Sequence, residues 1–546
     1  MSAAGGRWRD LLRRPAAAGL LAVAAALAAH GTILRNEFVS DDADIIVSNP
    51  DTRDLSQLGK VLLSPDSTKA VHPGVHAEEP YYRPLNRASY LIDYQLAGMS
   101  PAWFHAVNLA LHALSVWLLF ALGLRLFGAT APALGAALLL ALHPIHCEAV
   151  AWASARNNLF VAVFSLGAFI VFIDAARRRS MLLATASALL FLFALGSKEP
   201  GAMLLPVLAA WLFLPGLPGA SAGPRRAWLL FPHALALGAY LVLRNVALGG
   251  LLPFQSAHEG IGARLLANWH LLPRYLRVVA FPDLLTVFYD PPRFDSAWII
   301  GWAIIGAAVF VFLRWRTVPG TVGLLWLAAN WIPISGLVPT PSAEMAERFF
   351  HVPAIGVWLL AAEGARRLSL VLPRAPVAAG AAAILLALGV RAAVRDRDWR
   401  DDDTLFRTSV AAAPDSKLAR FAFGVVLKDR GDLAGARREW EEALRLDPRD
   451  AGSMTQLGTA AATQGDLAGA ERMYRDALAI NPCLAEANLN LGHIFARRGL
   501  AGDARRSYQA VLGCEPPAAP EVAAQARARL AALGAVLGLA GQRPPP

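Results

Sequence analysis

Eleven apolar runs occupy much of the first 396 residues of the chain and constrain its fold more than any other feature. A helix needs about 20 apolar residues to cross the hydrocarbon core of a bilayer. Several runs are shorter, so their ends must extend into flanking polar residues. We therefore predict an all-α, polytopic membrane domain. The runs lie at 16–34, 105–127, 131–144, 158–174, 180–196, 201–217, 228–247, 297–313, 321–338, 351–365 and 375–394.

The formal net charge of +10 does not indicate a nucleic-acid-binding protein, because the arginines cluster in short joints between the apolar runs. Such joints mark cytoplasmic loops. A cytoplasmic N-terminus then puts the chain after about Asp396 on the outer side. The segments predicted to lie outside are 35–104, 145–157, 197–200, 248–296 and 339–350. The basic joints are Arg7, Arg9, Arg13 and Arg14; Arg125; Arg177–Arg179; Arg225 and Arg226; Arg314 and Arg316; and Arg366, Arg367 and Arg374.

Two features of this topology have alternatives. The basic and then apolar N-terminus could be a cleaved signal peptide, although the many later spans favour a retained first span. The segment Arg264–Pro282 is poorly apolar, with Trp269 and His270 inside it. If it crossed the membrane, the joint Arg314–Arg316 would lie outside, against the charge rule. We therefore predict an amphipathic helix on the outer surface.

After the last apolar run, four kinds of residue recur every 34 positions. This period, with small, aromatic and proline residues at fixed offsets, is the signature of tetratricopeptide repeats (TPRs). The small residues let the two helices of a hairpin approach closely, and the aromatic residue fills the joint to the next repeat. The recurring residues are Gly424, Gly458 and Gly492; Ala436, Ala470 and Ala504; Trp440, Tyr474 and Tyr508; and Pro414, Pro448, Pro482 and Pro516.

The predicted domains follow from these two patterns. Residues 1–396 form the membrane domain, with 35–104 as its outer catalytic loop. Residues 397–414 are a linker and half-repeat, 415–516 are three TPR repeats, and 517–546 are a capping helix with a disordered tail.

The chain has three cysteines, too few for a disulfide scaffold, and none has zinc-ligand spacing. Cys483 precedes the first helix of the last repeat, and Cys514 lies near the end of its second helix. Antiparallel helices bring these ends together, so a disulfide is an option in an oxidising compartment.

Polar residues converge on the outer side of the predicted membrane domain. Three carboxylates directly follow the first span: Asp41, Asp42 and Asp44. Placing a carboxylate near the membrane costs free energy unless it faces water or a partner. A solvated turn is the alternative for these three. The convergence indicates an active site at the outer face. The further candidates on this side are Arg83, His143, His146, Glu148, Arg156, Lys198, Glu199 and Arg348.

Several motifs together resemble one family. They are the acidic pair after the first span, Arg-Pro-Leu from Arg83, Phe-His-x-x-Asn-x-x-Leu-His from Phe104, His-Pro-Ile-His-x-Glu-Ala-Val from His143, Ser-Lys-Glu from Ser197 and Glu-Arg at Glu347. Followed by TPRs, this set resembles the transmembrane-and-TPR protein O-mannosyltransferases and their bacterial relatives. The resemblance implies a GT-C fold and a bacterial inner-membrane protein with periplasmic repeats.

The resemblance also implies an inverting transfer of mannose or another hexose from a polyprenyl-phosphate donor to a protein Ser or Thr hydroxyl. Such a transfer needs a carboxylate base and cations that hold the leaving phosphate. Neighbouring side chains of an extended segment point to opposite faces, so only one aspartate of the pair faces the acceptor. We favour Asp41 as the base, with Asp42 orienting it, and Arg83 and Arg348 as phosphate ligands.

Other donor-side or substrate-binding candidates are His146, Glu148, Arg156, Lys198 and Glu199. A divalent metal on His143, His146 and Glu148 is an alternative, since imidazole and carboxylate suit zinc or manganese. We favour a structural role, because Pro144 disfavours a helix that would align the two histidines. For Glu199, a simple charge pair with Lys198 is the alternative to a role in the donor site.

Two other classes of protein, a scaffold and a transporter, predict different sequence patterns. A non-catalytic, membrane-anchored TPR scaffold for assembly of an envelope complex would carry no convergent polar set. A transporter would show internal symmetry and charges at mid-membrane, neither of which the sequence has. The partners that follow from the transferase are a lipid-linked sugar, the bilayer, and a polypeptide held in the TPR groove, with no nucleic acid.

Overall fold

The computed structural model describes residues 14–65, 81–218, 226–250, 261–289, 297–314, 316–337, 345–514 and 518–540. These residues form helices joined by short turns, with no β-strand among them. The described residues up to Leu405 form one compact unit, and those from Phe406 onward form a second. The all-α prediction is confirmed for the described part of the chain.

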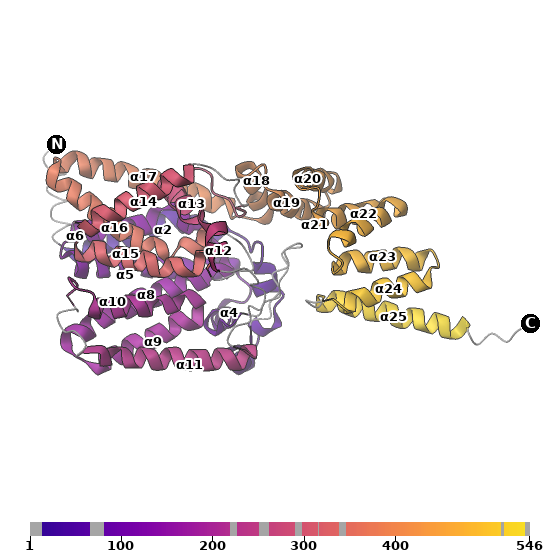
Figure 1. The fold of residues 1–546 in the computed structure, drawn as a ribbon, viewed down its shortest axis with the longest axis horizontal. Coiled ribbons are helices and arrows are strands. Elements are labelled where there is room, and N and C mark those ends of the chain that lie inside the picture. Colours follow the sequence, from indigo (N-terminus) through magenta and orange to yellow (C-terminus); the bar gives the residue numbers. More distant parts are fainter. Residues whose placement is uncertain are drawn as a thin grey trace, which may run out of the picture. The chain divides into compact units, whose positions relative to one another are not determined.

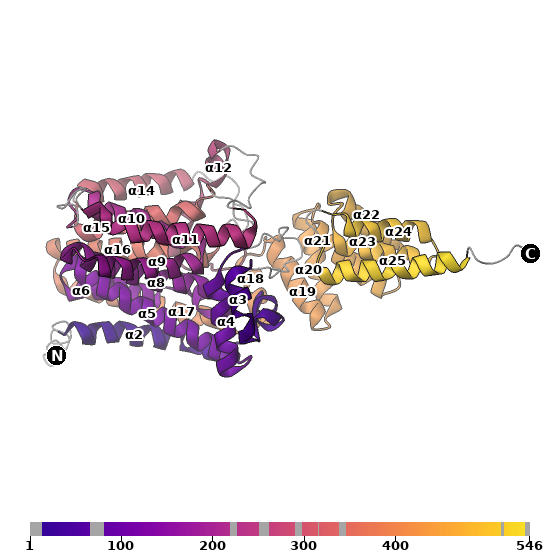
Figure 2. The same cartoon turned by 90° about the horizontal axis from the view of Figure 1, so that it is seen from below.

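Each of the eleven apolar runs coincides with a helix of the first unit. The long helices lie side by side and roughly parallel to one another (Figure 1; Figure 2 shows them from below). Their bounds are α2 (Pro15–His30), α5 (Pro101–Phe127), α6 (Thr130–Leu142), α8 (Arg156–Arg178), α9 (Met181–Ser197), α10 (Leu204–Phe213), α11 (Phe231–Leu248), α14 (Ala297–Arg314), α15 (Val318–Trp331), α16 (Pro353–Val371) and α17 (Arg374–Asp398).

By length and composition, five helical stretches among the described residues could cross a membrane. A bent pair, Thr130–Leu142 and Pro144–Ala151, makes a sixth if it is one span. Most of the other predicted spans are shorter apolar helices, so the number of spans and their direction stay predictions. The five stretches are Pro15–Arg35, Pro101–Phe127, Ala153–Arg178, Arg226–Leu248 and Arg374–Asp398.

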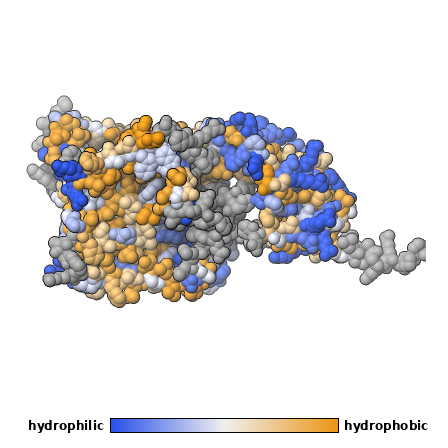
Figure 3. Space-filling view, viewed as in Figure 1, coloured by the Kyte–Doolittle hydropathy of each residue, from blue (hydrophilic) through white to orange (hydrophobic). Residues whose placement is uncertain are grey.

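The bundle is packed through small residues, as in other helical membrane proteins. Where α15 crosses α16, a Cβ atom added at Gly356 would lie 2.5 Å from the carbonyl oxygen of Gly323. An added Cβ at Gly123 of α5 would lie 3.0 Å from Ala133 of α6. Only glycine permits these close approaches, which increase the contact between neighbouring helices. The face of this unit seen in Figure 3 is largely apolar where its residues are described, as a lipid-facing surface must be.

The segment Arg264–Pro282 forms two short helices, α12 (Ile261–Asn268) and α13 (Leu271–Ala280), instead of the single amphipathic helix that we predicted. The ten residues of α13 are too few to cross a bilayer. This helix buries Tyr275 and Val278 against the bundle, so it is amphipathic as expected.

The second unit consists of three helical hairpins between α18 (Asp402–Ala412) and α25 (Pro520–Ala540). They are α19 (Lys417–Asp429) with α20 (Leu433–Leu446), α21 (Ala451–Thr463) with α22 (Leu467–Ile480), and α23 (Ala485–Arg497) with α24 (Ala501–Leu512). α25 packs against α24, in the place of the predicted capping helix. The predicted disordered tail, Arg543–Pro546, lies outside the described residues.

The recurring glycines lie beneath the recurring aromatic rings. An added Cβ at Gly424 would lie 2.3 Å from the indole of Trp440, and one at Gly458 would lie 2.8 Å from Tyr474. The aromatic residue therefore packs mainly inside its own hairpin, and only secondarily at the joint that we predicted. The disulfide between Cys483 and Cys514 is present, with 5.3 Å between their Cα atoms.

Candidate functional site

The acidic pair lies in a loop that leaves α2 through a short turn at Gly31–Arg35. Ser40 has φ of 55°, a left-handed conformation that is uncommon outside glycine and asparagine. Its backbone N–H donates to Asp402 Oδ1 at 2.8 Å. The Glu37 N–H donates to the Arg400 carbonyl at 2.8 Å. These bonds hold the loop against the residues that follow α17, which are more than 350 positions later in the sequence.

Asp42 is completely buried. Its Oδ1 accepts from the Ser154 N–H at 2.8 Å, and its Oδ2 accepts from the Val39 N–H at 3.2 Å. Burial outweighs these bonds and raises the pKa of Asp42 to about 7. Asp42 thus anchors the acidic loop to the segment after α7 (Cys147–Ala151).

Asp41 is half-buried and differs from Asp42 in environment. Our premise of an extended segment was wrong, because Asp42 has helical angles (φ −58°, ψ −33°) and begins the turn Ala43–Val47. The two side chains nevertheless have different surroundings, since one is enclosed and the other keeps solvent access. The two aspartates are therefore not equivalent.

Arg156 is a structural residue in this arrangement, which differs from its predicted role at the donor. It is completely buried, and its Nε donates to Asn108 Oδ1 at 2.8 Å. Its other nitrogens bond Ser89 Oγ, Asp93 and the Phe104 carbonyl. With all three nitrogens engaged by protein groups, Arg156 holds α4 (Pro84–Ala97), α5 and α8 together.

Four cations form a cluster, here called the cationic cluster: Arg83, Lys198, Arg244 and Arg348. Arg83 Nη2 and Arg244 Nη1 both face Glu199, at 3.0 and 3.5 Å from its two oxygens. Arg348 pairs with Glu148 and lies 4.8 Å from the ring of Trp152. Two carboxylates against four cations leave an excess of positive charge.

Lys198 connects the two halves of the cationic cluster. Its Nζ donates to Asn158 Oδ1 at 2.8 Å and lies 5.0 Å from the ring of Phe349. Burial, and then the positive charges of Arg83 and Arg348, lower the pKa of Lys198 well below its ordinary value. Burial opposes ionisation of Glu199, but the charge of Arg83 prevails and lowers its pKa. This cluster therefore favours an additional anion.

Two donors of α11 lie beside Glu199, the buried Nη1 of Arg244 and the hydroxyl of Tyr240. Arg244 Nη1 forms a long ion pair with Glu199 Oε1, at 3.5 Å, and interacts with the Tyr240 hydroxyl, but neither atom makes a hydrogen bond of ordinary geometry among the described residues. Such weakly satisfied donors can donate to a bound oxygen, for example that of a phosphate. The sequence reasoning missed Arg244. The signal was a cation inside the apolar run 228–247, since a charge within a span is commonly functional.

The acidic loop and the cationic cluster share one connecting segment. Ser154 binds Asp42, while Trp152, two residues earlier, lies against Arg348. The hydroxyl of Tyr90 donates to the Ser154 carbonyl at 3.1 Å and fixes the same segment from α4. The structure therefore brings together the predicted residues Asp42, Arg83, Glu148, Lys198, Glu199 and Arg348.

The histidines of the His-Pro-Ile-His motif do not share a metal centre with Glu148. His146 Nδ1 lies 2.9 Å from His351 Nδ1, and Trp358 Nε1 donates to His146 Nε2 at 3.1 Å. His143 Nε2 lies 2.8 Å from the Val279 carbonyl oxygen. Glu148 instead binds Arg348. These contacts agree with the structural role that we favoured for the motif.

Fold and site together describe a polytopic membrane protein with a carboxylate loop beside a cationic, anion-favouring cluster. No family model matches the chain. Curated relatives match the chain. It is 27% identical to Protein O-mannosyl-transferase TMTC1 of Homo sapiens, over 82% of this chain and 57% of that protein. It is 25% identical to Protein O-mannosyl-transferase F38B6.6 of Caenorhabditis elegans, over 79% of this chain and 62% of that protein.

The resemblance that the motifs predicted is thus confirmed, and the chain spans about 60% of the length of these relatives. Among solved structures, an oligosaccharyltransferase of Archaeoglobus fulgidus in the apo form aligns with 12% identity and a TM-score of 0.43. The alignment covers 71% of this chain and 56% of that one.

Proposed function

We propose that the chain is a membrane glycosyltransferase that moves a sugar from a polyprenyl-phosphate donor to a hydroxyl group of a protein acceptor. The observation that carries the proposal is the cationic cluster joined to the acidic loop through Trp152–Ser154. The similarity to protein O-mannosyltransferases supports the reaction class. Mannose is the first sugar to test, because it is the one in the names of these relatives.

Asp41 is the general base in this proposal. It takes the proton of the acceptor hydroxyl while the oxygen attacks the anomeric carbon, and the bond from that carbon to the phosphate oxygen breaks. Attack opposite the leaving group inverts the anomeric configuration. Asp42 keeps the loop in position through its two backbone hydrogen bonds. A general base contributes about 10²–10⁴-fold to a rate.

The leaving polyprenyl phosphate gains negative charge as the bond breaks, and the cationic cluster stabilises that charge. Arg244 and Tyr240 supply weakly satisfied donors beside Glu199, and Arg83 supplies a guanidinium that Glu199 orients at 3.0 Å. Burial and the neighbouring cations lower the pKa of Lys198, so a bound phosphate would favour its protonated form. The apolar surface of the bundle accommodates the polyprenyl chain in the surrounding lipid.

The disulfide between Cys483 and Cys514 supports an outer location for the helical hairpins. Disulfides persist in the periplasm and other oxidising compartments, and they are rare in the cytosol. We infer that the hairpins lie on the outer side and hold part of the polypeptide acceptor, as TPR grooves bind extended peptides.

A transfer assay with purified protein tests this proposal. The full chain in detergent receives polyprenyl-phosphate mannose and an unmodified secreted protein, and mass spectrometry detects the added hexose. We expect transfer by the wild type, and Arg244→Gln should reduce it by about 10²-fold, the effect of losing one donor to a developing oxyanion.

The matched control is Arg125→Gln. Arg125 also pairs with a carboxylate, Asp174, at 3.2 Å. It lies near the C-terminal end of α5 and is not part of the cationic cluster. Its transfer rate should equal that of the wild type. If no sugar is transferred from any lipid-linked hexose tested, the scaffold role is the better description.

A further inference from the structure

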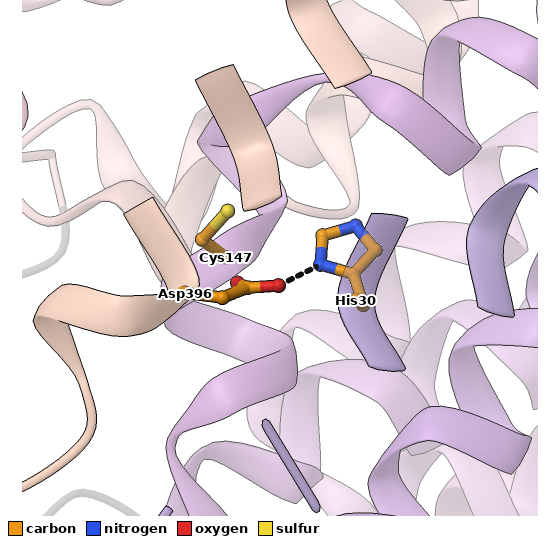
Figure 4. A group of neighbouring side chains, drawn as sticks. All are labelled: His30, Cys147 and Asp396. Atoms are coloured by element: carbon orange, nitrogen blue, oxygen red, sulfur yellow. Dashed lines mark hydrogen bonds and ion pairs between the residues drawn. The ribbon is translucent and has the colours of Figure 1, made fainter. Parts of the chain in front are cut away.

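Three side chains that are far apart in the sequence meet in the interior of the first unit. His30 is the last residue of α2, Cys147 is the first residue of α7, and Asp396 lies near the end of α17. One potential ligand atom from each lies within 4.8 Å of the others, and all three residues are buried. Figure 4 shows Asp396 and His30 facing each other along a hydrogen bond, with Cys147 next to Asp396.

The direct contacts among them leave the site incompletely satisfied. His30 Nδ1 lies 2.8 Å from Asp396 Oδ2, whereas Asp396 Oδ1 has no hydrogen-bond partner among the described residues. The other ring nitrogen of His30 also lacks one. The thiol of Cys147 interacts with Asp396 and donates a long bond, 3.5 Å, to the Ala392 carbonyl. A carboxylate with no exposed surface and an unpaired oxygen is costly unless a cation compensates it.

The ligand types indicate which cation would compensate that charge. Thiolate, imidazole and carboxylate together are typical of Zn²⁺, with metal–ligand distances of about 2.0–2.3 Å. A thiolate and a carboxylate carry two negative charges, so a bound Zn²⁺ makes the site neutral, which suits a buried position. Ligand atoms around such an ion are about 3.3–3.8 Å apart in a tetrahedral site. The three ligand atoms already lie within 4.8 Å of one another, so small shifts of the side chains would bring them to this tetrahedral spacing.

We propose that His30, Cys147 and Asp396 bind a zinc ion with a structural role. This site shares Cys147 with the segment that carries the histidine motif but uses neither His143 nor His146, and it goes beyond the proposed transfer reaction. It escaped the sequence analysis because its ligands come from three distant helices instead of one short spaced motif.

The position of the zinc site explains what it would stabilise. Asn36, at the start of the acidic loop, donates its side-chain amide to the Asp396 carbonyl at 3.1 Å. The ion therefore ties α2, α7 and α17 together directly beneath the loop that carries Asp41 and Asp42. Loading with zinc should make this junction more rigid and increase the thermal stability of the unit.

Metal analysis of the purified full chain tests the proposal. We expect about one zinc per chain after gel filtration, falling below about a tenth in Cys147→Ala and in Asp396→Asn, since each removes one of three protein ligands. The matched control is Cys483→Ser with Cys514→Ser, which removes the disulfide cysteines and should keep the zinc.

A spectroscopic test does not depend on how well the ligand variants fold. In the Cys483→Ser, Cys514→Ser protein, Cys147 is the one cysteine that remains. Replacing zinc with Co²⁺ should then give a thiolate-to-cobalt charge-transfer band in the near ultraviolet. Absence of this band, no stoichiometric metal in the wild type, or full zinc retention in Cys147→Ala would each overturn the assignment. None of these results depends on sugar transfer.

Discussion

Substitution of Asp42 by Asn tests whether the acidic loop is held by a buried carboxylate. Asp42 has no exposed surface, accepts two backbone N–H groups, and has a pKa of about 7. Asparagine is nearly the same size but has no charge and only one acceptor oxygen. The change therefore removes the cost of burying the charge and also weakens one hydrogen bond.

The size and sign of the effect follow from the pKa. Burial raises the pKa of Asp42 from its ordinary value of 3.8 to about 7, which corresponds to at most about 4 kcal/mol. Because the pKa is raised on folding, the native protein binds more protons than the unfolded chain between about pH 4 and 7. The contribution of Asp42 to stability is present below pH 4 and is lost as the pH rises through about 7. The lost hydrogen bond subtracts about 1 kcal/mol at every pH.

The assay is thermal unfolding of the purified full chain in detergent from pH 5 to 8. We expect the Tm of Asp42→Asn, relative to the wild type, to rise with pH and to level off above about pH 7. The control is Asp54→Asn: Asp54 is fully exposed, and its hydrogen bonds with Ser56 lower its pKa, so it titrates below this range. A relative Tm for Asp42→Asn that is flat over the whole range would refute the reasoning.

Three further predictions concern the reaction and the topology. Asp41→Asn should reduce sugar transfer by about 10²–10⁴-fold with an unchanged Tm, as expected for loss of a general base; equal transfer by the variant and the wild type would exclude that role. Single cysteines placed at Lys60 and Gln464, in a protein lacking the native three, should react with an impermeant thiol reagent from outside, and one at Arg178 should be protected; the reverse pattern would invert the topology. Deletion of 404–546 should preserve transfer to a short peptide and sharply reduce transfer to full-length protein; undiminished modification of the full-length acceptor would show that the hairpins do not recruit it.

The helices and the general location of the site could be predicted from the sequence, because both depend on local patterns. Apolar runs form helices wherever lipid or a packed core surrounds them, and all eleven runs did so. The 34-residue period likewise located the hairpins, although it placed the aromatic residue at the joint between repeats and not over the glycine of its own hairpin, where Trp440 lies against Gly424. The carboxylates after the first apolar run were identified by their cost near a membrane, and Arg83 and Arg348 by the match between a guanidinium and phosphate oxygens.

The roles of individual residues depended on contacts between distant segments. Arg156 has the guanidinium of a phosphate ligand, but Asn108 and Asp93 enclose it. Arg244 lies within an apolar run, and its Nη1 makes only a long ion pair with Glu199, at 3.5 Å. The order of residues along one helix cannot indicate which side chain of another helix will satisfy a given charge.

The sequence by itself determined which segments of this protein are helical, where the hairpin repeats begin, and which family it resembles. The tertiary structure alone decided which of the two aspartates is buried, which cations remain available for an anion, and that His30, Cys147 and Asp396 meet. The physical reason is that backbone conformation and burial pattern are set by neighbours along the chain. Solvation and charge pairing are set by whatever the fold brings into contact.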